Sequence, residues 1–199
     1  MTSKSIGFAH APGATPLDRD EIDALIPTSV VTQAELNEWE QANILEGVAW
    51  TQSRRTQKIL AVESLTELHF RMFSRTWAWA GTFRRSNKNI GGEWSHVPTA
   101  LRDLSEDVRH WIEHSTFTAD EIGARFHHRL VQIHPFPNGN GRFARLATDV
   151  LLKRELSVRA FTWGSSRLDD ASDTRAKYIA ALRAADQHDI TLLLEFVRS

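Results

Sequence analysis

Apolar residues recur at helical spacing along most of the chain. A stripe of this kind covers one face of a helix and is buried against its neighbours. Seven segments share the spacing: Leu36, Trp39 and Leu45; Leu65, Leu68, Met72 and Phe73; Leu101, Leu104, Val108, Trp111 and Ile112; Ile122, Phe126, Leu130 and Ile133; Phe143, Leu146, Val150 and Leu151; Tyr178 to Ala185; and Leu192 to Val197. We therefore expect an all-α fold.

Three of these segments are preceded by a hydroxyl residue with a glutamate three positions later, the pattern of a capping box. The pairs are Thr32 with Glu35, Ser64 with Glu67, and Thr118 with Glu121. The first pair predicts a helix over about residues 32–47. The third predicts a helix that ends at His134.

The helical spacing is interrupted between Trp77 and Pro98. Gly81 and the pair Gly91-Gly92 lie there among Phe83 and Trp94, with asparagines between them. Turn residues between apolar ones predict a small β-hairpin, although the glycines could equally form a turn alone.

The length of 199 residues suits one domain, expected over 31–199, after an extended lead-in over 1–30 that is rich in Pro, Gly, Ser and Thr. The formal net charge of -1 indicates no overall attraction to nucleic acid or membranes. The absence of cysteine excludes disulfides and thiolate chemistry, and no apolar run is long enough for a signal peptide or membrane span. We expect a cytoplasmic protein.

The segment His134 to Arg145, HPFPNGNGRFAR, holds the candidate chemistry. Two prolines end the preceding helix, and Gly139 and Gly141 lie where the next helix begins. The N–H groups and dipole of a helix amino end bind anions, and glycine lets a phosphate approach the backbone. Arg142 is three residues from Arg145, so both guanidiniums could hold one polyphosphate.

His134 adds a candidate base, because an imidazole with a pKa of about 6.5 accepts protons at neutral pH. These residues predict phosphoryl or nucleotidyl transfer. The run from Gly139 to Ala144 also fits a dinucleotide-binding fingerprint, but that fingerprint follows a strand and here a helix and prolines precede it. Arginines paired with carboxylates of a neighbouring helix are the structural alternative.

The segment resembles the Fic domain signature HPFx(D/E)GNGRxxR, with Asn138 in place of the acidic residue. The resemblance covers about residues 32–199, and within Fic proteins it is greatest to the group called mobile mystery protein B. It implies an all-α Fic fold and a protein adenylyltransferase. In such an enzyme His134 deprotonates a Ser, Thr or Tyr hydroxyl of a target protein, which attacks the α-phosphate of ATP.

The resemblance also implies roles around the nucleotide. Asn140, with the backbone of Gly139 and Gly141, would form the anion hole. Arg142 would hold the β-phosphate and Arg145 the γ-phosphate. Residues bordering the adenosine would be Tyr178 and Asp186, although Tyr178 could equally be a packing residue. Ala80 to Pro98 resembles the flap that docks targets, where Ile90 and Gly91 would contact the target's backbone.

ANILEG, from Ala42 to Gly47, resembles the inhibitory motif (S/T)xxxE(G/N) of many Fic proteins, with Ala42 in place of the hydroxyl residue. The resemblance implies that Glu46, followed by Gly47, pairs with Arg145 and blocks the γ-phosphate. Asn138 offers Mg²⁺ an amide oxygen without charge, which predicts weak metal binding.

Two other functions stay open from the sequence. Glu46 could align water to remove AMP from modified targets. Alternatively, since Asn138 departs from the signature, the domain could be a nucleotide-sensing interaction module without catalysis. The resemblance further implies a helix-turn-helix companion protein, with no direct nucleic-acid binding by this chain. The sequence does not define an oligomeric state.

Overall fold

The computed structural model describes residues 17–52, 58–165 and 173–199. Its helices are α1 (Arg19–Asp23), α2 (Gln33–Thr51), α3 (Val62–Phe73), α4 (Val97–Glu113), α5 (Ala119–Ile133), α6 (Asn140–Arg154), α7 (Asp173–Asp186) and α8 (Thr191–Arg198), with 3-10 turns at Trp94–His96 and Trp163–Ser165. The described residues form no strand beyond one isolated bridge between Leu25 and Trp77. The all-α prediction is confirmed.

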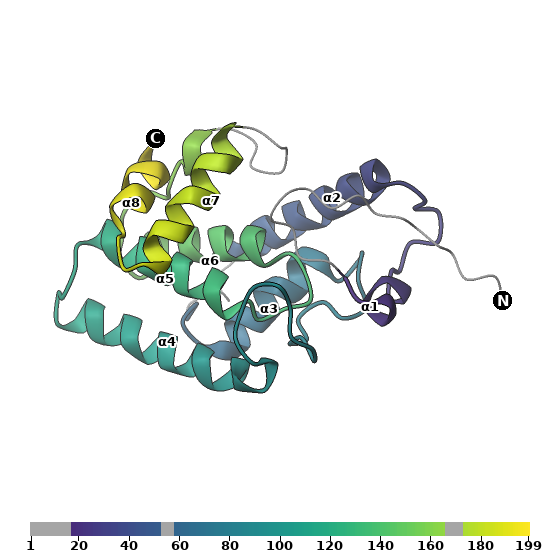
Figure 1. Ribbon diagram of the computed structural model, residues 1–199, viewed down its shortest axis with the longest axis horizontal. Helices are drawn as coiled ribbons and strands as arrows, with labels where there is room; N and C mark the ends of the chain where they lie inside the picture. Colours follow the sequence, from purple (N-terminus) through teal and green to yellow (C-terminus); the bar gives the residue numbers. More distant parts are fainter. Residues whose placement is uncertain (1–16, 53–57, 166–172) are drawn as a thin grey trace.

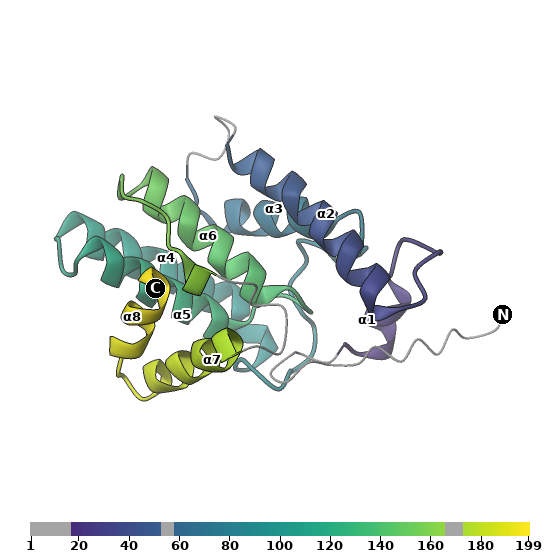
Figure 2. The same ribbon diagram turned by 90° about the horizontal axis from the view of Figure 1, so that it is seen from above.

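Helices α5 and α6 form the centre of the molecule. They pack against each other, with α2 and α3 on one side and α7 and α8 on the other (Figures 1 and 2). Helix α4 packs along α5. The loop between α5 and α6, which carries the candidate chemistry, is therefore fixed by the two most enclosed helices.

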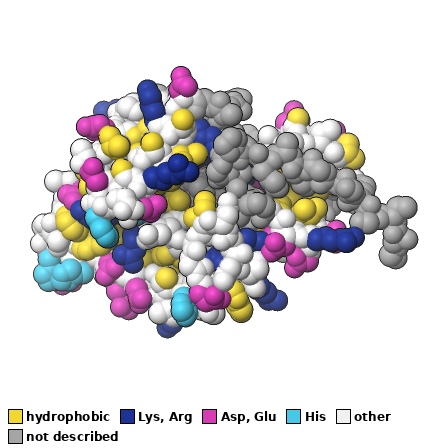
Figure 3. Space-filling model, viewed as in Figure 1, with side chains coloured by type: hydrophobic (Ala, Val, Ile, Leu, Met, Phe, Trp, Pro, Cys, Tyr) yellow, Lys and Arg dark blue, Asp and Glu magenta, His cyan; other side chains and the backbone are white. Residues whose placement is uncertain are grey.

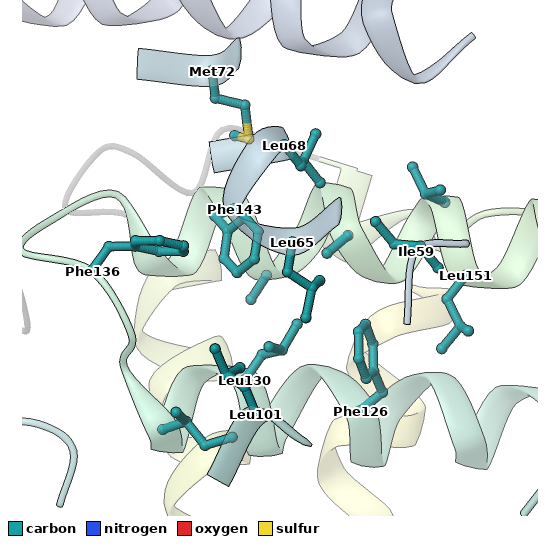
Figure 4. Close-up of a cluster of buried hydrophobic side chains, with 14 of the residues drawn as sticks. Ile59, Leu65, Leu68, Met72, Leu101, Phe126, Leu130, Phe136, Phe143 and Leu151 are labelled. Carbon is teal, nitrogen blue, oxygen red and sulfur yellow. The ribbon is translucent and has the colours of Figure 1, made fainter. Parts of the chain in front are cut away.

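The apolar core has two parts that meet at these central helices. The larger part connects the five helices from α2 through α6. It includes side chains such as Leu65, Phe126 and Phe143, which point toward one another in Figure 4. The smaller part packs α7 and α8 against α5 and α6, and includes Phe161 and Tyr178. Burial on both sides keeps the α5–α6 loop in place.

Two of the three expected helix caps are confirmed. Thr32 accepts the N–H of Glu35 at 3.2 Å while the Glu35 carboxylate accepts the N–H of Thr32 at 2.9 Å. Thr118 accepts the N–H of Glu121 at 3.3 Å. The Ser64 cap is wrong: α3 begins at Val62 after Ala61, without a side-chain cap.

Other boundaries also differ from the expectation. Helix α2 continues to Thr51 instead of ending near residue 47, because Gly47 packs inside a helix pair. The lead-in expected over 1–30 contains the short helix α1, while its residues 1–16 lie outside the described part.

Positive and negative side chains are mixed over the face seen in Figure 3. This agrees with the nearly balanced formal charge. Among the described helices, none combines the length and the apolar character that a membrane span needs.

Candidate nucleotide site

The candidate site is the turn between α5 and α6. His134 follows the last residue of α5 in a left-handed conformation, with φ 52° and ψ 60°, and Gly139 precedes α6 with φ 77°. Glycine adopts this conformation without strain, whereas for histidine it is uncommon and marks functional positions. The first bond of α6 runs from the Phe143 N–H to the Gly139 carbonyl, so the N–H groups before Phe143 lie at the open amino end.

The side chain of Asn140 holds the loop in shape. It is buried, its Oδ1 accepts the N–H of Phe136 at 3.0 Å, and its Nδ2 donates to the carbonyl of Phe136 at 2.8 Å. Both ends of the amide are thus engaged by one backbone unit. The expected contribution of Asn140 to an anion hole therefore falls to its backbone N–H, and its side chain shapes the loop.

His69 on α3 supports the same loop from the core, a role that sequence reasoning missed. Its ring stacks on Phe136 with centroids 3.7 Å apart, and Phe136 also packs edge-on against Phe143 (Figure 4). The Nε2 of His69 donates to the carbonyl of Asn138 at 3.1 Å, and its Nδ1 accepts the N–H of Gly81 at 3.0 Å. These two bonds require one neutral tautomer. The signal in the sequence was a histidine on the apolar face of α3.

His134 has the protonation state that a general base needs. Its Nδ1 lies 3.3 Å from the carbonyl of Val131, and because a carbonyl only accepts, Nδ1 carries the proton and Nε2 the lone pair. Burial lowers the pKa of His134 to about 4, with smaller contributions from the charges of Arg84 and Lys88. The imidazole is consequently neutral at physiological pH.

The first motif arginine already has a carboxylate partner. Arg142 Nη1 lies 2.9 Å from an oxygen of Glu40, whose other oxygen accepts the indole N–H of Trp77 at 2.8 Å. The guanidinium also lies over the ring of Phe73, 5.2 Å from its centroid. Glu40 is buried on α2. The motif's local charge is thus partly neutralised by a helix distant in sequence.

Glu46 does not occupy the position that the inhibitory motif predicted. It pairs with Arg75 instead of Arg145, and roughly half of its side chain is exposed. Glu46 is six positions after Glu40 on α2, which at about 100° per residue places the two carboxylates on different faces of the helix. Gly47 likewise faces Met72 of α3. The expected Glu46–Arg145 pair is wrong, and Glu40 is the glutamate of α2 that pairs with the motif.

Helix α7 contributes the residues expected near the adenosine. The Tyr178 hydroxyl lies 2.8 Å from Nε2 of buried His127 on α5. Burial raises the pKa of Tyr178, while the charge of Arg145 and a hydrogen bond from it act in the opposite direction. Asp186 lies 2.8 Å from Nε2 of His128. Both residues line the groove described below, and both also join α7 to α5. The position of Tyr178 thus agrees with a packing role as well as with a place beside the adenosine.

Asn138 was the expected metal ligand. Its side-chain oxygen accepts the N–H of Gly139 at 2.6 Å, so this oxygen is directed to its own loop. The described residues contain no group of three or more His, Asp or Glu side chains that could hold a metal ion. The donor set therefore fits Mg²⁺ poorly unless other ligands supply the charge.

The flap segment, residues 80–98, is not the expected β-hairpin: residues 80–93 form a loop, and residues 94–98 are the 3-10 turn and the start of α4. The Asn87 side chain binds where a facing strand was expected: its Oδ1 accepts the backbone N–H of Trp94 at 2.9 Å, and its Nδ2 donates to the Glu93 carboxylate at 2.8 Å. Gly91 has φ 98° and its backbone lies against His134. The flap segment thus borders the candidate base.

These elements enclose a groove of about 1950 Å³, which we call the motif groove. Its lining includes every residue predicted for the site except Glu46 and Gly47: His134, Asn138, Gly139, Asn140, Gly141, Arg142, Arg145, Tyr178, Asp186, Ile90 and Gly91. Glu40 lines it as well. Its size is ample for a nucleotide together with a segment of another chain.

Comparison with known proteins points to one family. Residues 59–152 match the Fic/DOC family. The chain is 32% identical over 145 residues to "Protein adenylyltransferase Fic" of Drosophila virilis and 28% identical over 142 residues to "Protein adenylyltransferase fic-1" of Caenorhabditis elegans. The match with the Drosophila protein covers 69% of this chain but 28% of that protein. The chain therefore spans less than a third of the length of these curated relatives.

Solved structures give the same fold. The N-terminal Fic domain of a Bartonella quintana Bep effector superposes with a TM-score of 0.68 at 16% identity, covering 96% of this chain and 89% of that one. The BepC protein of Bartonella tribocorum, solved with bound AMPPNP, gives a TM-score of 0.66 at 15% identity and covers 89% of this chain and 95% of that one. At such identities the likeness concerns the fold alone.

Proposed function

Residues 59–152 of this chain form a Fic/DOC family domain, and on that premise we propose that the protein transfers AMP from ATP to a hydroxyl of a target protein. The observation that carries the proposal is the state of His134. Its Nδ1 lies 3.3 Å from the Val131 carbonyl, which makes Nε2 the basic nitrogen of the ring, and the residue lines the motif groove. A neutral imidazole beside a helix amino end suits the activation of a hydroxyl next to a phosphate.

In the proposed reaction, Nε2 of His134 accepts the hydroxyl proton of a Ser, Thr or Tyr. The hydroxyl oxygen bonds to the α-phosphorus of ATP, and the bond from that phosphorus to the bridging oxygen breaks. Pyrophosphate leaves with the electron pair, and AMP remains esterified to the target. The amino end of α6 stabilises the charge on the α-phosphate oxygens through the N–H groups before Phe143.

We assign the β- and γ-phosphates to the two motif arginines. Arg142 and Arg145 both line the motif groove one turn apart on α6. The charge of Arg145 acts on the Tyr178 hydroxyl, which supports a position of the second guanidinium toward the end of the nucleotide beside α7. Guanidinium forks match phosphate oxygens in pairs, so both arginines favour a polyphosphate over a single anion.

We further propose that Glu40 is the inhibitory carboxylate of this chain. It is buried and holds Arg142 at 2.9 Å, so a phosphate seated on that guanidinium must displace it. Glu46 lies on another face of α2 and pairs with Arg75, which favours Glu40 over Glu46 for inhibition and disfavours Glu46 as the base that activates water for AMP removal.

Any Mg²⁺ in the site would be held mainly by the phosphates of the nucleotide. Asn138 Oδ1 already accepts one N–H, and an amide adds no charge. Magnesium, when bound, would neutralise phosphate charge. We expect Asn138→Asp to lower the Mg²⁺ concentration needed for transfer.

The assay for the proposed function is incubation with ATP labelled on the α-phosphate and Mg²⁺. We expect weak labelling of protein by the native chain, stronger labelling by Glu40→Gln, and none by Glu40→Gln combined with His134→Ala. Glutamine keeps an oxygen that can accept from the Trp77 indole, but it lacks the negative charge with which Glu40 holds Arg142. The matched control is Glu46→Gln on the same helix, which should label like the native chain.

The results separate the alternatives. A rise in labelling with Glu46→Gln but not with Glu40→Gln would restore the assignment made from the motif. Nucleotide binding without label in any sample would favour a nucleotide-sensing module, which the poor fit of Asn138 to a metal supports. The helix-turn-helix companion and the cytoplasmic location stay predictions, testable by co-purification and cell fractionation.

A further inference from the structure

Arg84 is a buried arginine at the junction between the flap segment and α5. Its side chain is almost fully enclosed, and it is among the largest buried residues of the protein. Its guanidinium donates to the carbonyls of His134 at 2.7 Å, Ser86 at 2.9 Å and Gly92 at 2.6 Å, with a longer bond to Ile133 at 3.5 Å. One planar group thus joins the carboxyl end of α5 to both limbs of the flap segment.

The contacts with α5 have a clear electrostatic reason. The last carbonyls of a helix lack partners within the helix and carry its negative dipole end, where a cation is favourable. Arg84 binds the carbonyls of Ile133 and His134 at that end. Within the described residues no carboxylate forms an ion pair with it, so carbonyl dipoles stabilise the charge. Burial lowers the pKa of Arg84 although Glu93 acts against this.

The flap segment is bound at two places by the same group. Ser86 and Gly92 are six residues apart, and both carbonyls bind the Arg84 guanidinium. The backbone N–H of Arg84 also donates to the carbonyl of Pro135 at 2.9 Å, in the loop between α5 and α6. The flap segment is therefore attached to this loop by both the backbone and the side chain of Arg84.

Gly91 shows how close this contact is. A Cβ atom at residue 91 would lie 2.8 Å from Nη2 of Arg84 and 3.0 Å from Cβ of His134. Both distances are shorter than normal contacts. The flap backbone thus rests directly on the candidate base and on the arginine that binds its carbonyl.

We propose that Arg84 is a positioning residue, which sets the distance between the His134 imidazole and a target chain aligned on the flap segment. The inference rests on the proposed function, because the distance matters only where the flap presents a hydroxyl to His134. Misplacement by about 1 Å far from the chemistry costs on the order of a hundredfold in rate. Arg84 touches neither motif arginine, so its effect should fall on the rate constant and leave ATP binding intact.

The test compares Arg84→Met, Arg84→Lys and the control Arg102→Met, all with Glu40→Gln to relieve the inhibition. Arg102 is an exposed arginine of α4 outside the flap segment and outside the lining of the motif groove, and its replacement removes the same charge. Self-labelling with α-labelled ATP gives the rate constant at saturating ATP and the half-saturating concentration. Thermal unfolding reports the folded fraction. Tryptic cleavage after Lys88 reports loosening of the flap, and NMR follows the titration of His134.

We expect Arg84→Met to lower the rate constant about a hundredfold. Its half-saturating ATP concentration should stay within about twofold, Lys88 should be cleaved faster, and the pKa of His134 should rise. Lysine keeps the positive charge but cannot reproduce the several fixed donors of the guanidinium. Arg84→Lys should therefore restore the pKa of His134 more fully than the rate constant of labelling. Arg102→Met should match its parent throughout.

Two results would overturn the inference. A lower unfolding temperature with an unchanged rate constant per folded molecule would make Arg84 structural only. If no sample labels, the proposed function fails, and cleavage and titration then decide: an Arg84→Met protein with native cleavage at Lys88 and native His134 titration would remove the positioning role as well.

Discussion

At the scale of residues, burial decides which side chains around the motif hold a proton. His69, His127 and His134 are all enclosed, and burial lowers the pKa of each, to about 3 for the first two and about 4 for the third. His69 and His127 use their neutral rings to hold the loop and Tyr178. His134 has the same physical state with its ring in the motif groove. Burial thus keeps the candidate base His134 neutral in the same way as the structural histidines His69 and His127.

A titration of His134 tests this state. Its folded pKa of about 4 is below the value of about 6.5 for an unperturbed imidazole, so the base should stay neutral down to about pH 5. We expect the NMR signal of its ring to titrate near pH 4 in the folded protein. His134→Ala identifies the signal. A midpoint near 6.5 with the fold intact would show that burial does not control this proton.

Single residues also show the limit of reading a motif. The glycines and arginines of HPFPNGNGRFAR line the motif groove as their types predict, because helix ends and guanidiniums bind anions in any fold. The roles of His69 and Arg84 could not be predicted from the motif, because both side chains donate to carbonyls of residues distant in sequence. Asn140 lines the motif groove, and its side-chain amide binds the backbone of Phe136.

At the scale of elements, the rotation of α2 determines which glutamate meets the motif. The helix was expected from its cap and apolar spacing; the cap is present, but of the expected apolar stripe only Leu36 is buried. Its apolar positions do not form one clean stripe, since Leu45 and Trp39 are exposed while Glu40 and Asn43 are buried. A mixed pattern leaves the buried face undefined. The contacts with α3 and α6 decide it.

Gly47 on α2 gives a test of this packing. A Cβ atom at residue 47 would lie 2.6 Å from Cγ and 3.2 Å from Cα of buried Met72. Alanine ordinarily favours a helix by about 1 kcal/mol over glycine. Here the clash should prevail, and Gly47→Ala should lower the free energy of unfolding by about 1–3 kcal/mol in urea titration.

The comparison for this change is Gly92→Ala in the flap segment, where a Cβ atom meets nothing within 4 Å. Its unfolding free energy should stay within about 0.5 kcal/mol of native. A higher urea midpoint for Gly47→Ala would mean that α2 and α3 are farther apart than described.

The flap is the element for which the spacing of residues misled. Turn residues between apolar ones suggested two paired strands, yet a lone hairpin is marginal in water without further partners. Here the polar backbone is satisfied by Arg84 and Asn87. A side-chain donor, Arg84, and a side-chain acceptor, Asn87, bind backbone groups that a facing strand would otherwise bind.

At the scale of the whole molecule, two core parts meet at α5 and α6 and hold the site between them. The larger part carries α2 and the flap, and the smaller part carries α7. The buried histidines and Asp149 lie in this framework. Their titration therefore links the stability of the entire fold to pH.

We expect stability to fall as the pH drops from 6.5 toward 4. The unfolded chain binds protons on His69, His127 and His134 near pH 6.5, while the folded protein resists until pH 3 to 4. Each histidine adds up to about 1.4 kcal/mol per pH unit. Asp149, with its pKa raised by burial to about 6, opposes this between about pH 6 and 4, because the folded form binds its proton first.

Urea midpoints measured from pH 7.5 to 4.5 test whether the three buried histidines, which lower stability as the pH falls, outweigh Asp149, which raises it. His127→Gln, which can still accept from the Tyr178 hydroxyl, should make the decline shallower. A midpoint independent of pH over this range would contradict the neutral state of the buried histidines.

The sequence alone determined the helical class, most helices, two caps and the position of the turn between α5 and α6 that is proposed to bind phosphate. These follow from local rules: apolar spacing, side-chain capping and the N–H groups of a helix end act between residues close in the chain. Tertiary structure alone decided that Glu40 and not Glu46 meets the motif, that Arg84 joins the flap to His134, and that His69 supports the loop. Each of these contacts joins elements 50 or more residues apart, where only packing of the whole chain sets which faces meet.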